Sequence, residues 1–170
     1  LAVLSTVVND VEPDLEHHPD EGMCEAEHFV LSLRDISQII WELTKNGAAA
    51  LQYLDKAFAI CREFPYRFHT EARGDIWYRH LNMLNESGSG EKAIADAREM
   101  VEKEKKESHA PRPIIPDPLY ETVNPYIFYS LRFLAEQAYK AGKTAEACAL
   151  FDEAYRYFPL SQAGVREIGR

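Results

Sequence analysis

Hydrophobic side chains recur at three- and four-residue intervals along most of the chain, which is the pattern of amphipathic helices. The first such stretch ends at Asn46-Gly47, a dipeptide typical of a helix C-terminus, and the second ends before Pro65. Because only two or three residues connect them, the two stretches are predicted to pack as an antiparallel helix pair over about 28–65. The apolar positions of the first stretch are Phe29, Val30, Leu33, Ile36, Ile39, Ile40 and Leu43.

The same unit of two helices is predicted twice more. The second pair covers about 72–107, with a Ser-Gly-Ser-Gly turn at 87–90, and the third covers about 123–159, with a turn at Gly142. The last ten residues, 161–170, could begin a seventh helix that covers the open end. The chain is therefore predicted to be all-α, an α-α superhelix of about three antiparallel pairs with a C-terminal capping helix.

Two segments lack this helical spacing of apolar residues. Residues 1–27 contain two prolines, many acidic residues and no helical period, so we expect an acidic arm before a helical domain over 28–170. Residues 108–122 contain four prolines, a density that excludes a helix and favours an extended polyproline path. Because this proline-rich insert also contains apolar residues, we expect it to pack on the helical body.

The third pair carries a recurrent sequence signature. The matching positions are Leu131, Leu134 and Ala135 in its first helix, Gly142 at the turn, and Ala147, Phe151, Ala154 and Pro159 in and after its second helix. This spacing resembles a tetratricopeptide repeat. Small residues let the paired helices approach closely, and Phe151 would fill the space between units. Two positions depart from the signature: Leu131 replaces the usual aromatic residue, and Ala138 stands where an aromatic residue is common.

The second pair matches the signature less closely. Trp77 precedes Ala93 by 16 residues, as Leu131 precedes Ala147, but His80 stands where leucine is expected. The two units are 54 residues apart, whereas the repeat length of the family is about 34. The first pair keeps only a spacing of small and apolar positions. A compact helical bundle with one repeat-like hairpin is the alternative architecture.

The resemblance implies a binding surface. Tetratricopeptide arrays hold a peptide or a partner helix in a concave groove lined by the first helix of each pair. The exposed first-helix positions that would bind a partner are Tyr78, Asn82, Asn85, Tyr129, Arg132, Glu136 and Tyr139. Such residues combine contact area with directed hydrogen bonds, although they could equally just solvate a helix face. Asn82 and Arg132 are candidate members of the family's carboxylate clamp, but the full set of clamp residues is missing.

The expected function is a non-catalytic protein- or peptide-binding module that acts as a scaffold. One alternative is a regulatory or sensor domain that binds a small ligand or peptide and controls an attached effector. Another is a helical enzyme domain with its active site at the acidic arm. The sequence contains no glycine-rich phosphate loop, HExxH or GxSxG motif. An open polar groove would favour a partner chain, and a closed apolar pocket would favour a small ligand.

The proline-rich insert leaves three interpretations open. It could cover the groove from within, which would make the module self-inhibited. It could be a ligand for an SH3- or WW-type domain through Pro113–Pro116. Otherwise it is a tethered surface loop.

Charge and cysteine content limit the partners and the compartment. The formal net charge is −9, and eight acidic residues with no lysine or arginine lie within residues 1–28. An acidic chain repels phosphate backbones, so nucleic acid is not an expected partner, and no apolar run is long enough to cross a membrane. Three widely separated cysteines fit a reducing compartment, so we expect a cytoplasmic protein. Cys61 and Cys148 have apolar helical neighbours and are interpreted as buried structural thiols.

One cluster resembles a metal site. It comprises His17, His18, Asp20, Cys24 and His28, of which the last two are four residues apart and would share a helix face. Zinc takes nitrogen and sulfur ligands at such spacings. Adjacent histidines are common in acidic arms and no CxxC motif is present, so no metal or cofactor is predicted.

Overall fold

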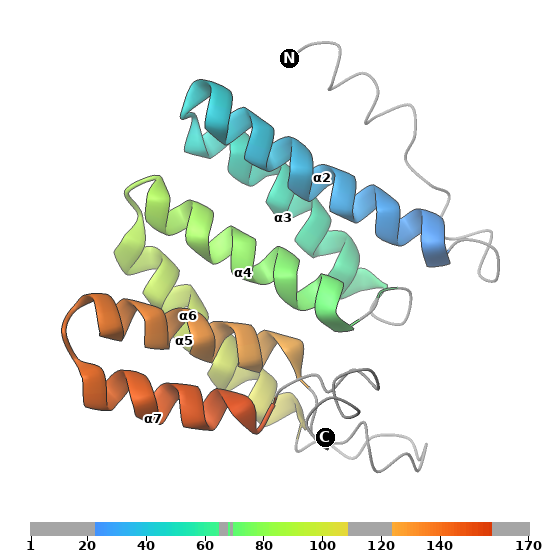
Figure 1. The fold of residues 1–170 in the computed structure, drawn as a ribbon. Coiled ribbons are helices and arrows are strands. Elements are labelled where there is room, and N and C mark those ends of the chain that lie inside the picture. The colour runs from blue at the N-terminus through green and yellow to red at the C-terminus, as the bar shows by residue number, and fades with distance from the viewer. Residues whose placement is uncertain (1–22, 65–67, 69, 109–123, 158–170) are drawn as a thin grey trace, which may run out of the picture. The chain divides into compact units, whose positions relative to one another are not determined.

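The computed structural model describes residues 23–64, 68, 70–108 and 124–157 (Figure 1). The described residues form six helices and no strand, which confirms the predicted all-α class. The helices are α2 (Met23–Thr44), α3 (Gly47–Glu63), α4 (Thr70–Glu86), α5 (Gly90–Ser108), α6 (Pro125–Lys140) and α7 (Thr144–Tyr155).

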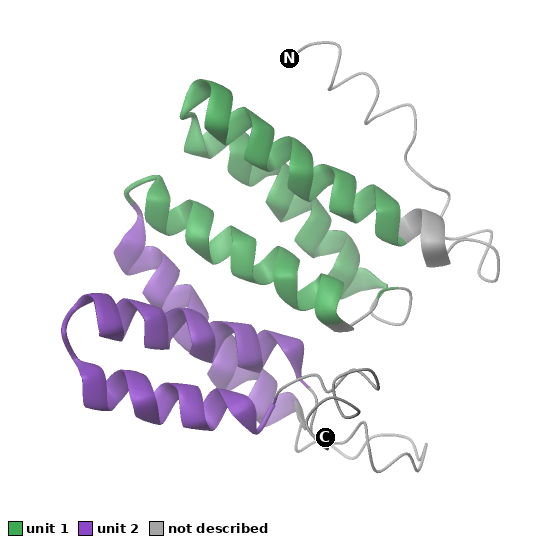
Figure 2. Cartoon of the chain, in the orientation of Figure 1, with its two compact units in different colours: residues 1–88 green, residues 89–170 purple. Residues whose placement is uncertain are grey.

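The chain divides into two compact units, shown in different colours in Figure 2. Unit 1 spans residues 1–88 and contains α2, α3 and α4; unit 2 spans residues 89–170 and contains α5, α6 and α7. The boundary lies in the Ser-Gly-Ser-Gly turn, inside the second predicted helix pair. Within the described residues, each unit therefore contains three consecutive helices.

The first turn of unit 1 is determined by local hydrogen bonds. Only Lys45 and Asn46 separate α2 from α3, and Lys45 adopts a left-handed backbone conformation with φ of 53°. The Asn46 side chain then accepts a hydrogen bond from the Ala49 N–H at 3.1 Å, which caps the start of α3. So short a connection makes the two helices antiparallel, as the sequence predicts.

The core of unit 1 lies where α3 packs on both α2 and α4. Its buried residues form two clusters, one of Phe29, Val30, Leu33, Ala57, Ile60, Cys61, Phe68 and Ile76, and one of Ile40, Ala50, Leu54 and Met83. Gly47 at the start of α3 lies directly against Ser87, so that a Cβ atom at Gly47 would collide with the Ser87 Cβ. Trp77 is buried on α4 and stacks on His80, with ring centroids 5.3 Å apart.

In unit 2, α6 packs on both α5 and α7. Asn124 caps α6 by accepting hydrogen bonds from the N–H groups of Tyr126 and Ile127, and its amide donates to Glu104 of α5 at 2.8 Å. The turn between α6 and α7 passes through Gly142, whose φ of 76° favours glycine. The predicted turn at Gly142 is confirmed, and α6 begins at Pro125, close to the predicted start of the third pair at about residue 123.

Small residues bring α6 and α7 together. Ala147 and Ala154 are the buried positions of α7, and Ala154 shares a core cluster with Val101, Ile127, Phe128 and Leu131. Phe151, the large residue of the predicted signature, is half-buried. An ion pair between the Lys105 Nζ and the Glu153 Oε1, 2.7 Å apart, also joins α5 to α7.

The structure differs from the sequence-based expectation at Cys148, which is exposed, whereas Cys61 is buried as expected. The face of α7 that carries Cys148 points away from α6, since the buried alanines lie on another side of this helix. The helix α2 begins at Met23, within the segment taken as the acidic arm. Residues 1–22, the proline-rich insert apart from Ser108, and the C-terminal capping helix lie outside the described residues.

Candidate functional site

Three of the predicted binding residues lie on α4 in unit 1. Tyr78, Asn82 and Asn85 are spaced four and three residues apart, so they share one face of the helix, and all three are half-buried. The Asn82 amide donates a hydrogen bond to the Tyr78 backbone carbonyl at 2.9 Å. One of its two N–H donors is thus already used within its own helix.

The other four predicted residues lie on α6 in unit 2, where they also share one face. The Arg132 Nε donates to the Glu136 Oε1 at 3.0 Å. Tyr129 is half-buried and packs edge-on against Phe128, with ring centroids 4.9 Å apart. Tyr139 is 66% exposed at the end of this face. We call Tyr129, Arg132, Glu136 and Tyr139 the α6 binding face.

The two candidate clamp residues belong to different units. Asn82 lies on α4 and Arg132 on α6, and each makes a hydrogen bond within its own helix. In unit 1, the region that would correspond to the clamp carries Asp35, which binds the neighbouring Arg34 with 2.8 Å between the Arg34 Nη2 and the Asp35 Oδ1. Both clamp candidates are therefore already engaged within their own helices.

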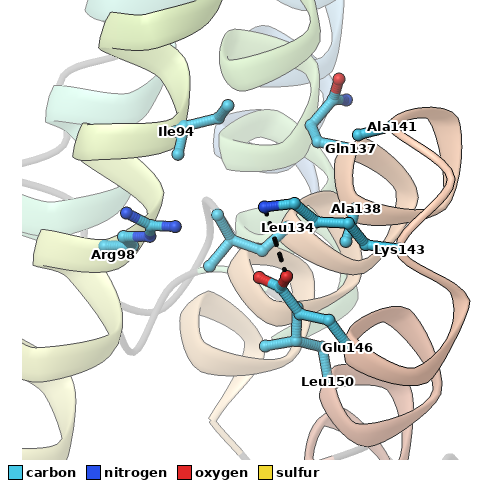
Figure 3. A pocket seen from close by; sticks show the side chains of 9 residues that line it. All are labelled: Ile94, Arg98, Leu134, Gln137, Ala138, Ala141, Lys143, Glu146 and Leu150. Carbon is cyan, nitrogen blue, oxygen red and sulfur yellow. Dashed lines mark ion pairs between the residues drawn. The ribbon is translucent and has the colours of Figure 1, made fainter.

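A pocket of about 160 Å³ lies within unit 2, between α5, α6 and α7 (Figure 3). Its lining residues are Ile94, Arg98, Leu134, Gln137, Ala138, Ala141, Lys143, Glu146 and Leu150. The Arg98 guanidinium reaches from α5 toward Leu134 of α6, and the ion pair of Lys143 and Glu146 borders the other side, with 3.5 Å between Nζ and Oε2 (Figure 3). This pocket was not predicted from the sequence.

The pocket and the α6 binding face lie on opposite sides of the same helix. Leu134, Gln137, Ala138 and Ala141 follow a spacing of three, one and three residues, which places them on one stripe. At 100° per residue this stripe is about half a turn away from that of Arg132 and Glu136. Unit 2 therefore presents two separate candidate surfaces.

The two cysteines described with their side chains differ in chemistry. Burial raises the pKa of the Cys61 thiol to about 12, and the positive charge of Arg73 only partly opposes this effect. A thiol with this pKa remains protonated at neutral pH and is a poor nucleophile. Cys148 is exposed on α7.

The predicted metal-like cluster lies largely beyond the described part of the chain. His17, His18 and Asp20 are outside it, as is the side chain of Cys24, while His28 is exposed on α2. Within the part that the structure describes, no group of three or more histidine, cysteine or acidic residues is arranged to hold a metal ion.

Two apolar residues of the predicted core stripe of α2 are exposed. Ile39 is 44% and Leu43 is 80% exposed, whereas the adjacent Ile40 is buried. The helices α3 and α4 pack against α2 on the side of Ile40, so the C-terminal end of the predicted apolar stripe of α2 faces away from them.

None of the helices in the described part of the chain combines the length and the hydropathy needed to span a membrane.

No family model, curated protein or solved structure matches this chain. Over the residues that it describes, the structure defines an all-helical class with three helices in each of two compact units.

Proposed function

We propose that this protein is a non-catalytic scaffold module that binds a protein or peptide partner through the first-helix surfaces of its helix pairs. The observation that carries the proposal is the α6 binding face, on which Tyr139 exposes an aromatic ring beside the Arg132–Glu136 ion pair. Tyrosine and arginine are enriched at the energetic centres of protein interfaces. In unit 1, the face of α4 that carries Tyr78, Asn82 and Asn85 is a second candidate surface, with a tyrosine and two amides but no charged residue among these three.

The chemistry of this face suits a peptide. Tyr129 is held by its contact with Phe128, so it would lose little conformational entropy on binding. Arg132 and Glu136 offer a donor group and an acceptor group in a fixed geometry because they already orient each other. An extended or helical segment could therefore contact the rings and exchange hydrogen bonds with the charged pair.

A reducing compartment, such as the cytoplasm, fits the free thiols of Cys61 and Cys148. The formal net charge of −9 disfavours nucleic acid as the partner. For the alternative function, a small-ligand sensor, the pocket of unit 2 is small. Its volume of about 160 Å³ lies below the roughly 300–1,000 Å³ typical of small-molecule sites.

The test is selection of peptides from a displayed random library on the full chain, followed by binding titrations with Tyr139→Ala. Tyr155 on α7 provides a matched control, since it is 69% exposed against 66% for Tyr139. We expect Tyr139→Ala to weaken the selected peptides at least tenfold and Tyr155→Ala to leave them unchanged. Selected peptides that tolerate Tyr139→Ala and Arg132→Ala would refute this binding surface.

A further inference from the structure

The pocket of unit 2 exists because two positions one turn apart, Ala138 in α6 and Ala141 at its C-cap, carry only methyl groups. Ala138 and Ala141 are three residues apart and face the space that Leu150 of α7 and Ile94 of α5 border. Leu134 and Ala138 are buried and form the floor, whereas Ala141 is exposed at the mouth. The pocket is thus a hollow that opens to solvent, with an apolar floor and with Arg98, Gln137, Lys143 and Glu146 among its lining residues.

The volume of this hollow limits what it can hold. A cavity of about 150 Å³ lined by leucine, isoleucine and phenylalanine accepts benzene, and this pocket measures about 160 Å³. One phenyl ring or one leucine side chain has about the size of that space, and a longer ligand would extend out of its mouth. The hollow therefore suits one side chain of a longer molecule.

The charged residues at the rim of the pocket determine which charge the ligand should carry next to the inserted side chain. Lys143 and Glu146 neutralise each other, with 3.5 Å between Nζ and Oε2. Arg98, on the α5 side of the pocket, makes no hydrogen bond or ion pair with any residue that the structure describes. Among the described residues, Arg98 is therefore the cation of the rim without an ion-pair partner, and a guanidinium pairs best with a carboxylate, which it can bind in a bidentate manner.

We propose that this pocket is a second binding site, which takes one aromatic or leucine side chain of an acidic peptide while Arg98 pairs with an adjacent carboxylate of that peptide. The site rests on the proposed function only in taking a peptide as its ligand. It lies on the side of α6 opposite to the α6 binding face, so the two sites can be tested separately.

The experiment is a titration of the full chain, followed by methyl NMR of Ile94, Leu134 and Leu150. The probe is a nine-residue peptide with one phenylalanine between glutamates, raised to millimolar concentration so that weak binding is detected. We expect shifts at these methyl groups. Replacing the phenylalanine of the peptide with alanine should weaken binding about tenfold or more, because burial of the ring supplies most of the affinity. Replacing its glutamates with glutamines should weaken binding about threefold to tenfold.

Variants of the protein identify the groups responsible. Arg98→Gln should weaken the glutamate peptide about threefold to tenfold and leave the glutamine peptide unchanged. Lys103→Gln is the matched control, because Lys103 is an exposed cation on the same helix and pairs with Glu107 outside the pocket. Ala141→Leu should close the mouth and abolish the shifts, and this position is exposed, so the helix has room for the larger side chain.

Three results would overturn the proposal: no shift at millimolar probe, equal weakening by Arg98→Gln and Lys103→Gln, or undiminished shifts in Ala141→Leu. The Tyr139→Ala variant tests the α6 binding face independently, because it should leave binding of the probe peptide at the pocket unchanged. Failure of the pocket would therefore not count as failure of the α6 binding face, and the reverse also holds.

Discussion

The Arg34 guanidinium on α2 donates a hydrogen bond to the Asp75 carboxylate on α4, with 2.8 Å between Nη1 and Oδ2. These two helices are separated in the chain by the whole of α3. Partial burial lowers the pKa of Arg34, but the hydrogen bonds and charges of Asp35 and Asp75 outweigh this effect and the pKa is raised. The Arg34 guanidinium therefore remains charged at every pH at which the protein is folded.

We expect Asp75→Asn to lower the free energy of unfolding by about 1–2 kcal/mol, because the pair is partly shielded from solvent and joins two helices. A double-mutant cycle with Arg34→Gln, measured by urea denaturation, should give a coupling energy of about 1 kcal/mol. Asp35→Asn is the control: this carboxylate also binds Arg34 but is 63% exposed and lies on the same helix. Its coupling to Arg34 should be about 0.5 kcal/mol or less, and equal couplings would argue against a role for the contact between α2 and α4.

Gly47 should not tolerate a side chain. Alanine normally stabilises a helix relative to glycine by about 0.5–1 kcal/mol, but here its Cβ would collide with Ser87. We expect Gly47→Ala to destabilise unit 1 by about 1–3 kcal/mol in thermal or urea denaturation. Adding Ser87→Gly removes the obstructing atom and should recover part of the loss. A stabilised Gly47→Ala variant would show that this approach of α3 to α4 is not tight.

The two thiols should differ sharply in reactivity. In a Cys24→Ser background, Cys148 should react with a thiol reagent at neutral pH, whereas Cys61 should react only as the protein unfolds. Cys148→Ser should abolish the fast phase. Rapid modification of Cys61 in the native protein would contradict its burial.

Cys61 should also make stability depend on alkaline pH. Its pKa is about 12 in the folded protein and about 9.0 when exposed, so the unfolded chain loses this proton first as the pH rises. The contribution of the neutral thiol is therefore complete below pH 9.0 and is lost between pH 9.0 and about 12. The free energy of unfolding should fall more steeply over this window in the wild type than in Cys61→Ala. Parallel pH profiles would show that the thiol does not contribute.

Asn124 has two separable roles, because it caps α6 and donates to Glu104. Serine caps a helix about as well as asparagine but is too short to keep the second contact. We expect Asn124→Ser to cost about 1 kcal/mol and Asn124→Ala about 2 kcal/mol in urea denaturation of the full chain. If the serine variant matched the wild type, the bond to Glu104 would be energetically neutral.

The helix boundaries could be predicted because they depend on neighbours in the sequence. Pro125 begins α6, and Gly142 supplies the left-handed turn before α7. Asn46-Gly47 marks the first boundary as predicted, but Asn46 caps the start of α3, Gly47 belongs to α3, and Lys45 adopts the left-handed conformation at the end of α2. Each signal acts within about four residues. The face that a helix buries is different, because it depends on which helix covers it. This is why Ile39 and Leu43 continue the apolar stripe of α2 and are nonetheless exposed.

For the candidate sites, too, features set by local sequence could be predicted, whereas features that depend on contacts between helices could not. The positions of the α6 binding face could be chosen from helical spacing alone, but the ion pair of Arg132 and Glu136 needed side-chain geometry. The pocket could not be predicted, since it forms only when Arg98 and Leu150, 52 residues apart in the sequence, face the same stretch of α6. One sequence signal pointed toward it: Ala138 stands where an aromatic residue is common in the repeat signature.

The bond between Asn124 and Glu104 has a consequence for protein engineering. It holds the start of α6 on α5, so the placement of these helices is secured by a direct contact on either side of residues 109–123. For a flexible connection, doubling its length costs only about 0.6 kcal/mol in loop-closure entropy. A reporter domain inserted between Ser108 and Asn124 should therefore leave the packing of α6 on α5 intact.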